Sequence, residues 1–263
     1  MTLLWSQKAI QRSLDYIVIR FFKALFRWRG VESYEPSERP NVVFGYVSMF
    51  GNKRYEKSRQ KFLQNPENVL RLTREKTLSD MLENYQQLSS FPEGSFGREF
   101  CEFMSSEEVD YAKFLSNYQK NQPSGLVEET PLAGLMKEHH RWEKDVHDII
   151  HVVFGYSRSR FGEGATIATH YFQGGAAGMI VLFLFGTVRV IYKRPSSILT
   201  MIRVWIDIYW RQRGVDLRSY PFEDNLEKPL EEIRLALGVR PPTKSINTCE
   251  RHTTWSKEVV KTL

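Results

Sequence analysis

Two histidines and a distant glutamate form the pattern in this sequence that is best suited to chemistry. His147 and His151 are four residues apart, so a helix would present both imidazoles on one face. Glu163 follows after eleven residues, and Gly155 and Gly162 in between allow the chain to reverse toward the pair. Two imidazoles and one carboxylate are typical ligands of a divalent metal and leave coordination positions open. The spacing therefore predicts a metal site.

The surroundings of the histidine pair predict that this site is buried. Six of the nine residues from 146 to 154 are apolar, and an unpaired polar group in such surroundings costs about 1–3 kcal/mol. Asp148 is expected to be a further metal ligand, or an acceptor that fixes the tautomer of a ligating imidazole. The alternative is a pair of buried histidines that bond to carboxylates and bind no metal. The presence of both Asp148 and Glu163 favours the metal site.

The remaining histidines are interpreted differently. His139 and His140 lie in a charged stretch and are predicted to be solvated and outside the site. His170 follows Glu163 by seven residues and shares its helix face, so it could line the same cavity. We interpret it instead as a core histidine with a polar partner.

The spacing also invites comparison with the H-E-x-x-H motif of zinc peptidases. There the glutamate is the general base, whereas this chain has Asp148, whose side chain is one methylene shorter. No convincing strand is predicted that could hold an extended substrate. A peptidase, or another metallohydrolase, is therefore a lesser alternative.

The elements that position these residues are predicted to be helices. One runs from about residue 132 to 154, a loop covers 155–162, and a second, apolar helix continues to about 192. Only residues 41–49 resemble a strand, and weakly. The predicted fold is all-α, a single helical domain with a buried metal site and an apolar channel. Further helices are expected within 53–90 (two or three, broken near Asn65-Pro66), 97–120, 195–210 and 226–237.

The stretch 171–188 carries no charged residue and reaches the lower length limit of a membrane-spanning helix. Gln173 and four glycines argue against a span, so a buried central helix is predicted. Its small residues would let another helix or a flat apolar ligand approach closely. These residues are Gly174, Gly175, Ala176, Ala177 and Gly178.

Residues 1–30 combine six bases with one acid and therefore carry most of the net charge of +6. Apolar side chains from Ile10 to Trp28 share one face of a helix there, and bases occupy the other. Three interpretations remain open: a core-packing helix, a helix lying on an anionic bilayer, and a mitochondrial targeting segment. The bases expected at a membrane surface are Lys8, Arg12, Arg20, Lys23 and Arg27.

The composition excludes several classes of protein. With 41% apolar and 13% aromatic residues, the chain of 263 residues is not globally disordered. Two cysteines exclude a disulfide scaffold and a cysteine-rich zinc module. The near-neutral remainder of the chain lacks a basic field, so no nucleic-acid partner is expected. The predicted organisation is a basic helix (1–30), a helical domain (31–240) and a polar tail (241–263).

The site residues belong to a longer pattern that resembles the coenzyme Q biosynthesis protein four family. His147, Asp148, His151 and Glu163 match that family's H-D-x-x-H-x11-E signature, and residues 91–100 are similar to its P-E-G-(T/S)-x-G-R-E-(Y/F) loop. Similarity covers roughly residues 35–240. Departures at 46–51, at 211–220 and at His170, where the family has Glu, indicate a divergent member.

The resemblance implies an all-α protein on the matrix face of the mitochondrial inner membrane, or on the cytoplasmic face of a bacterial membrane. It implies a divalent metal, usually zinc, and other quinone-biosynthesis proteins as partners, with a homodimer as a further expectation. The implied reaction removes the C1 carboxyl from a polyprenylated 4-hydroxybenzoate, in one version with hydroxylation of that carbon.

That reaction gives the residues roles that can be tested. Asp148 would be catalytic and move a proton. The prenyl tail would follow a channel lined by Phe172, Gly174, Gly175 and Gly178, and the basic helix would lie on the lipid surface. A non-catalytic, prenyl-lipid-binding scaffold of the quinone-synthesis complex is the main alternative.

Overall fold

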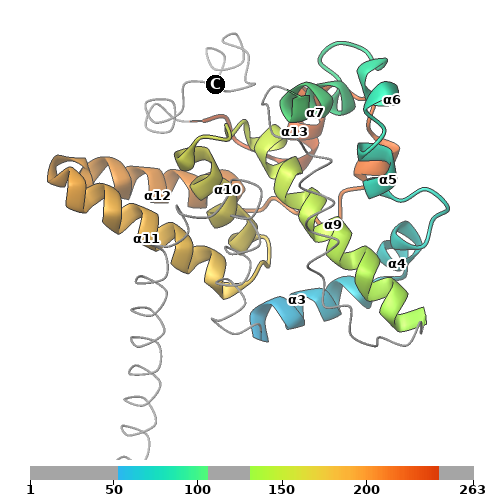
Figure 1. Cartoon of the computed structure of the whole chain (residues 1–263), viewed down its shortest axis with the longest axis horizontal. Helices are drawn as coiled ribbons and strands as arrows, with labels where there is room; N and C mark the ends of the chain where they lie inside the picture. The colour runs from blue at the N-terminus through green and yellow to red at the C-terminus, as the bar shows by residue number, and fades with distance from the viewer. Residues whose placement is uncertain (1–52, 106–130, 243–263) are drawn as a thin grey trace, which may run out of the picture.

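A computed structural model describes residues 53–105 and 131–242 (Figure 1). These residues are helical and contain no β-strand; an isolated bridge joins Ser95 and Pro229. The prediction of an all-α fold is confirmed for the described part of the chain. The segment 1–30 with the five bases predicted at a membrane surface, the strand-like stretch 41–49, residues 106–120 of the predicted helix 97–120 and the tail beyond residue 242 lie outside it.

The first half of the described chain contains short helices, and the second half contains long ones. Residues 53–90 form four helices rather than two or three, because Asn65 and Thr77 begin new helices by accepting hydrogen bonds from the following backbone. The last helix begins at Leu230 rather than at 226, directly after Pro229. The helices are α3 (Lys53–Leu63), α4 (Pro66–Leu72), α5 (Leu78–Leu82), α6 (Tyr85–Ser89), α7 (Phe96–Ser105), α9 (Pro131–Phe154), α10 (Arg160–Phe172), α11 (Ala177–Lys193), α12 (Ile198–Gln212) and α13 (Leu230–Leu237), with 3₁₀ turns at Pro195–Ser197 and Phe222–Asp224.

Helix α9 runs through the middle of the molecule (Figure 1). It packs against α4, α5 and α7 on one side and against α10 and α13 on others. Four apolar residues on this helix are fully buried, namely Val146, Ile149, Ile150 and Val153. The burial of their apolar surface stabilises the position of the helix. The helix that carries the two candidate metal-binding histidines is therefore held by most of the fold.

Two buried arginines fix the C-terminal end of α9. Arg234 donates from Nε to the carbonyl oxygen of Val153 over 2.8 Å, and Arg211 donates from Nη2 to that of Phe154 over 2.7 Å. Gly155 then turns the chain with a φ of 69°, which glycine adopts without strain. The last carbonyls of a helix have no partner within the helix, so these donors satisfy them and place positive charge at its negative end.

The prediction of one apolar helix from 162 to 192 is wrong, because the chain breaks between α10 and α11. Gly174 has a φ of 99°, and a Cβ there would lie 2.2 Å from Ser58 Oγ. A Cβ on Gly175 would lie 2.8 Å from the carbonyl oxygen of His170. Protein atoms thus fill the space beside both glycines, where the sequence predicted the approach of a helix or a flat apolar ligand.

Helix α11 is also not the buried central helix that its composition predicted. It pairs with α12 in a hairpin that projects from the body of the molecule (Figure 1), and Leu184 and Val188 on it are 42% and 54% exposed. Within the described part of the chain, no helix has the length and hydropathy needed to cross a membrane.

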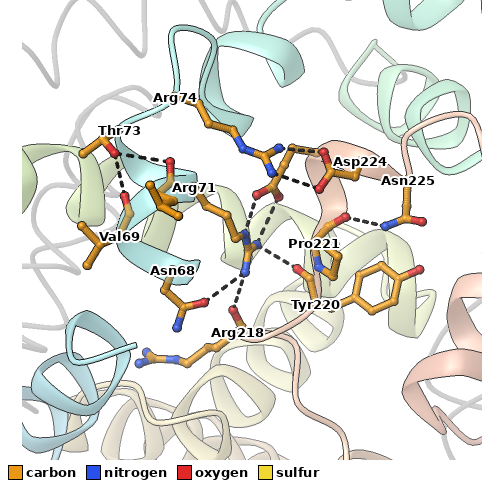
Figure 2. Close-up of polar contacts among 12 residues, drawn as sticks. Asn68, Val69, Arg71, Thr73, Arg74, Arg218, Tyr220, Pro221, Asp224 and Asn225 are labelled. Atoms are coloured by element: carbon orange, nitrogen blue, oxygen red, sulfur yellow. Dashed lines mark hydrogen bonds and ion pairs between the residues drawn. The ribbon is translucent and has the colours of Figure 1, made fainter. Parts of the chain in front are cut away.

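A buried arginine joins α4 to the segment before α13 (Figure 2). Arg71 forms an ion pair with Glu223 and donates to the carbonyl oxygens of Arg218 and Tyr220 at 3.1 and 2.8 Å. These bonds hold the backbone of Arg218 in place, and the Arg218 side chain then enters the network beside the candidate site.

Candidate metal centre

The structure brings His147, His151 and Glu163 together. Nε2 of His147 lies 3.4 Å from Oε2 of Glu163, and Nε2 of His151 lies 3.5 Å from Oε1. One ligand atom from each residue falls within 4.8 Å of the others, which makes the three a group that could hold a metal ion. Two ligands of a tetrahedral zinc ion, each about 2.0–2.1 Å from it, would lie about 3.4 Å apart. The spacing of these donors therefore fits a single metal ion.

Helix α10 aims Glu163 back at α9. The Ser159 side chain accepts a hydrogen bond from the Gly162 backbone over 3.0 Å, and the Glu163 backbone donates to the Ser159 carbonyl. The helix thus begins at Arg160, two residues earlier than the predicted end of the loop at Gly162. Glu163 lies in its first turn, where a carboxylate is favoured by the helix dipole.

The ring of His151 is oriented by the backbone. Its Nδ1 lies 3.1 Å from the carbonyl oxygen of Tyr156 and 3.2 Å from the hydroxyl oxygen of Thr166. A carbonyl can only accept, so Nδ1 carries a proton and donates it, which leaves Nε2 as the nitrogen that faces Glu163 and could ligate a metal. This is the tautomer a metal ligand requires, and a backbone acceptor is a common partner for a ligating histidine.

The interactions among the three residues shift the pKa values of His147 and Glu163. Burial by itself would lower the pKa of His147, but the hydrogen bond and charge of Glu163 outweigh it and raise that pKa. Burial would raise the pKa of Glu163, and the hydrogen bonds of both histidines instead lower it well below its usual range. Glu163 is therefore ionised at neutral pH, which is the form in which a carboxylate ligates a metal.

The site is closed on one side and open on the other. The His151 side chain is 2% exposed, whereas those of His147 and Glu163 are 25% and 41% exposed. A bound metal would therefore keep a face toward which a substrate could come.

Asp148 is not a member of the three-residue group. It lies beside it, since its charge helps to raise the pKa of His147 and, together with burial, the pKa of Tyr85 to about 12. The acceptor that fixes His151 is the Tyr156 carbonyl rather than Asp148. Asp148 thus remains available for a role other than coordination.

A buried charge network lies one helical turn from His147, and the sequence did not reveal it. His170 donates from Nε2 to Oε2 of Glu143 over 3.0 Å, and Arg218 forms an ion pair with the other carboxylate oxygen. Hydrogen bonding and charge from His170 and Arg218 outweigh burial and lower the pKa of Glu143. The interpretation of His170 as a core histidine with a polar partner is supported, and its ring lies 6.1 Å from that of His147. The four-residue spacing of Glu143 and His147 was the available signal.

The prediction that His139 is solvated is wrong. It is 1% exposed, its ring packs against Phe62 at 5.2 Å, and its Nε2 lies 3.7 Å from Glu143. Its neighbour His140 is exposed, as predicted.

Arg158 is a second residue that the sequence analysis missed. Its guanidinium lies over the Phe103 ring, 4.7 Å from the centroid, and donates to the Met104 sulfur. The Phe103 ring in turn stacks on His151 at 5.2 Å, and the charge of Arg158 acts on His147. Among the described residues, no carboxylate lies within ion-pair distance of this half-buried cation. A base in the loop directly after the histidine helix was the only signal in the sequence.

Two of the four predicted channel residues, Phe172 and Gly178, lie in helices rather than in the turn between α10 and α11. Gly178 is buried in α11, and Phe172 is half-buried with its ring 5.7 Å from that of Tyr209.

Comparisons with known proteins agree with one another. Residues 23–243 match the family described as "Coenzyme Q (ubiquinone) biosynthesis protein Coq4". The chain is 27% identical over 218 residues to the mitochondrial ubiquinone biosynthesis protein COQ4 homolog of Rattus norvegicus, covering 82% of this chain and 77% of that one. It is 24% identical over 195 residues to the Homo sapiens homolog, covering 73% and 68%.

The fold has also been seen in a crystal structure. A Nostoc punctiforme PCC 73102 protein assigned to ubiquinone biosynthesis superposes with a TM-score of 0.57 at 18% identity, covering 86% of this chain and 98% of that one. Because the family match spans most of the sequence and includes His147, His151 and Glu163, the chain belongs to the coenzyme Q (ubiquinone) biosynthesis protein Coq4 family.

Proposed function

We propose that this protein removes the C1 carboxyl group of a polyprenylated 4-hydroxybenzoate during ubiquinone biosynthesis. The observation that carries the proposal is the convergence of two imidazole nitrogens and one ionised carboxylate at 3.4–3.5 Å, with one face open. His147, His151 and Glu163 would hold a divalent ion, zinc by its preference for this donor set. When bound, that ion would act as a Lewis acid toward an oxygen of the substrate.

Asp148 is the proposed proton carrier. In the reaction the bond between C1 and the carboxyl carbon breaks, its electron pair stays on the ring carbon, and carbon dioxide leaves. A proton then takes the place of the carboxyl group, and Asp148, beside His147 but outside the ligand group, is positioned to deliver it. The version with hydroxylation of C1 would also consume an external oxidant such as dioxygen.

Arg158 is the proposed binding partner for the negative charge of the substrate ring. A benzoate carries a carboxylate, and its phenol oxygen gains charge when the ring is polarised. A half-buried guanidinium without an acidic partner among the described residues gains most from such a ligand. Its place on Phe103, which stacks on His151, puts that charge beside the metal centre.

The wider setting is also a proposal. Mammalian relatives are named as mitochondrial, which supports a mitochondrial location. The matrix side of the inner membrane is the proposed place of action. Other quinone-biosynthesis proteins, and a second copy of the chain, are proposed partners. Phe172 and Gly178 remain the proposed wall of a prenyl channel.

A non-catalytic prenyl-lipid-binding scaffold is the second candidate. It is favoured by the exposed apolar side chains of α11, such as Leu184 and Val188, which could contact a lipid without any reaction at the three ligands.

Release of labelled carbon dioxide distinguishes the decarboxylase from the scaffold. The zinc-loaded full chain is incubated with prenylated 4-hydroxybenzoate labelled in the carboxyl group, beside His147→Ala and Asp148→Asn. The decarboxylase predicts release by the native protein and its loss in both variants. Absence of release, with prenyl lipid still bound, would replace the enzyme by the scaffold.

A further inference from the structure

The hairpin of α11 and α12 carries most of the exposed large apolar side chains of the described chain. Ten of the twelve exposed large apolar side chains lie on these two helices. Isolated exposed apolar residues are ordinary, but ten on two helices that contact each other indicate a surface that meets a partner. The ten are Leu184, Val188, Val190, Tyr192, Ile198, Leu199, Ile202, Ile206, Tyr209 and Trp210.

Six of these side chains form two stripes along the helices. On α11, Leu184, Val188 and Tyr192 repeat every four residues, and on α12, Ile198, Ile202 and Ile206 do the same. Residues four apart share a helix face, so each helix presents one apolar stripe outward.

The opposite faces of both helices already have their partners. Phe183 packs on Trp205 at 4.6 Å between ring centroids, and the Trp205 indole donates to the Thr187 hydroxyl over 3.0 Å. Val204 and Ile208 are buried. The hairpin is thus apolar on two faces, of which the fold covers only one.

The charge of the hairpin is one-sided. Residues 177–213 contain six bases and a single acid, Asp207, which is 6% exposed. The exposed bases therefore have no exposed acid on the same hairpin. They are Arg189, Lys193, Arg194, Arg203 and Arg213.

We propose that this hairpin lies on an anionic lipid bilayer. Exposed aliphatic stripes flanked by Lys and Arg, with Tyr and Trp among them, are the features of a segment that enters the headgroup region without crossing the membrane. A second copy would bring two positive faces together, so charge disfavours a dimer through this surface. The inference rests on the proposed function only in its claim of action at a membrane, and it places that contact on α11 and α12.

The position of the hairpin suits a membrane-bound substrate. Helix α10, which carries Glu163, continues into α11 through the turn at 173–176 and packs against both hairpin helices. A bilayer that contacts the hairpin would therefore be linked, through α11 and α12, to the helix that carries Glu163.

Vesicle flotation with the full chain tests the proposal. Vesicles of phosphatidylcholine alone are compared with vesicles that also contain phosphatidylglycerol. The native chain is expected to float with the anionic vesicles and to be released by high salt. Ile202→Glu/Ile206→Glu and Lys193→Glu/Arg194→Glu are each expected to weaken binding by at least about tenfold. Leu235→Glu, on the exposed face of α13, is the matched control and is expected to bind like the native chain.

The outcomes are distinguishable from those of the proposed activity, because the assay needs neither metal nor substrate. Circular dichroism and thermal unfolding confirm that each variant folds. Equal flotation of the native chain and the isoleucine variant would overturn the proposal. So would an isoleucine variant that loses only a dimer in light scattering while its vesicle binding is unchanged, since a second copy would then cover this face.

Discussion

Arg234 on α13 donates a hydrogen bond from Nε to the carbonyl oxygen of Val153, two residues beyond His151. Its Nη2 bonds the Val152 carbonyl over 2.9 Å, and Nη1 forms an ion pair with Glu231. Burial lowers the pKa of Arg234 to about 10, which still leaves it charged at neutral pH. The segment of α13 thus caps the end of the helix that carries His147 and His151, the candidate metal ligands.

We expect Arg234→Met to lower the free energy of unfolding by about 2–4 kcal/mol, because two buried carbonyls and Glu231 lose their donor. Urea unfolding measures this change. Arg234→Lys keeps the charge but not the planar arrangement of donors. Its free energy of unfolding is expected to lie between those of the native chain and of Arg234→Met. A loss below about 1 kcal/mol in Arg234→Met would contradict the capping role.

His139 is expected to make the protein less stable in mild acid. Burial lowers its pKa to about 4, from an ordinary value of about 6.5. Below pH 6.5 the unfolded chain therefore binds a proton that the folded chain does not, and stability falls as the pH drops from about 6.5 to about 4.

His139→Phe keeps an aromatic ring against Phe62 and removes the titrating group. The variant is expected to lose up to about 3 kcal/mol less than the native chain between pH 7 and pH 4.5. Denaturant unfolding at both pH values gives the difference. Parallel losses in the two proteins would show that His139 does not titrate in this range.

Much of the candidate site could be predicted from the sequence, because its signals are local. The four-residue spacing of His147 and His151 needs only a helix, and the Gly155 turn directs the chain back. The burial of His139 and the role of Glu143 could not be predicted, because they depend on Phe62 and Arg218, which are distant in sequence.

The prediction of a single buried helix that includes α11 was wrong for a related physical reason. An uncharged stretch indicates apolar surroundings but does not distinguish a protein core from another apolar environment. The break at Gly174 depends on the packing of Ser58 against it and on the Gln173 side chain, which donates to the Val215 carbonyl and accepts from the Leu217 backbone N–H. None of these contacts is local.

Arg158→Ala is expected to separate substrate binding from metal binding. The KM for prenylated 4-hydroxybenzoate should rise about tenfold or more, because a charge-assisted hydrogen bond contributes about 1.5–3 kcal/mol. Zinc content should stay that of the native chain. Arg74→Ala removes an exposed arginine paired with Asp224 and is the control, with both quantities unchanged. An unaltered KM in Arg158→Ala would remove this residue from the substrate site.

Metal content, measured by mass spectrometry on zinc-loaded and dialysed full-length protein, tests the metal centre most directly. The native chain and Asp148→Asn are expected to retain about one ion per chain, because Asp148 lies outside the ligand group. His147→Ala and Glu163→Gln, checked for folding by circular dichroism, are expected to lose it. Metal content in these two variants equal to that of the native chain would contradict the proposed centre.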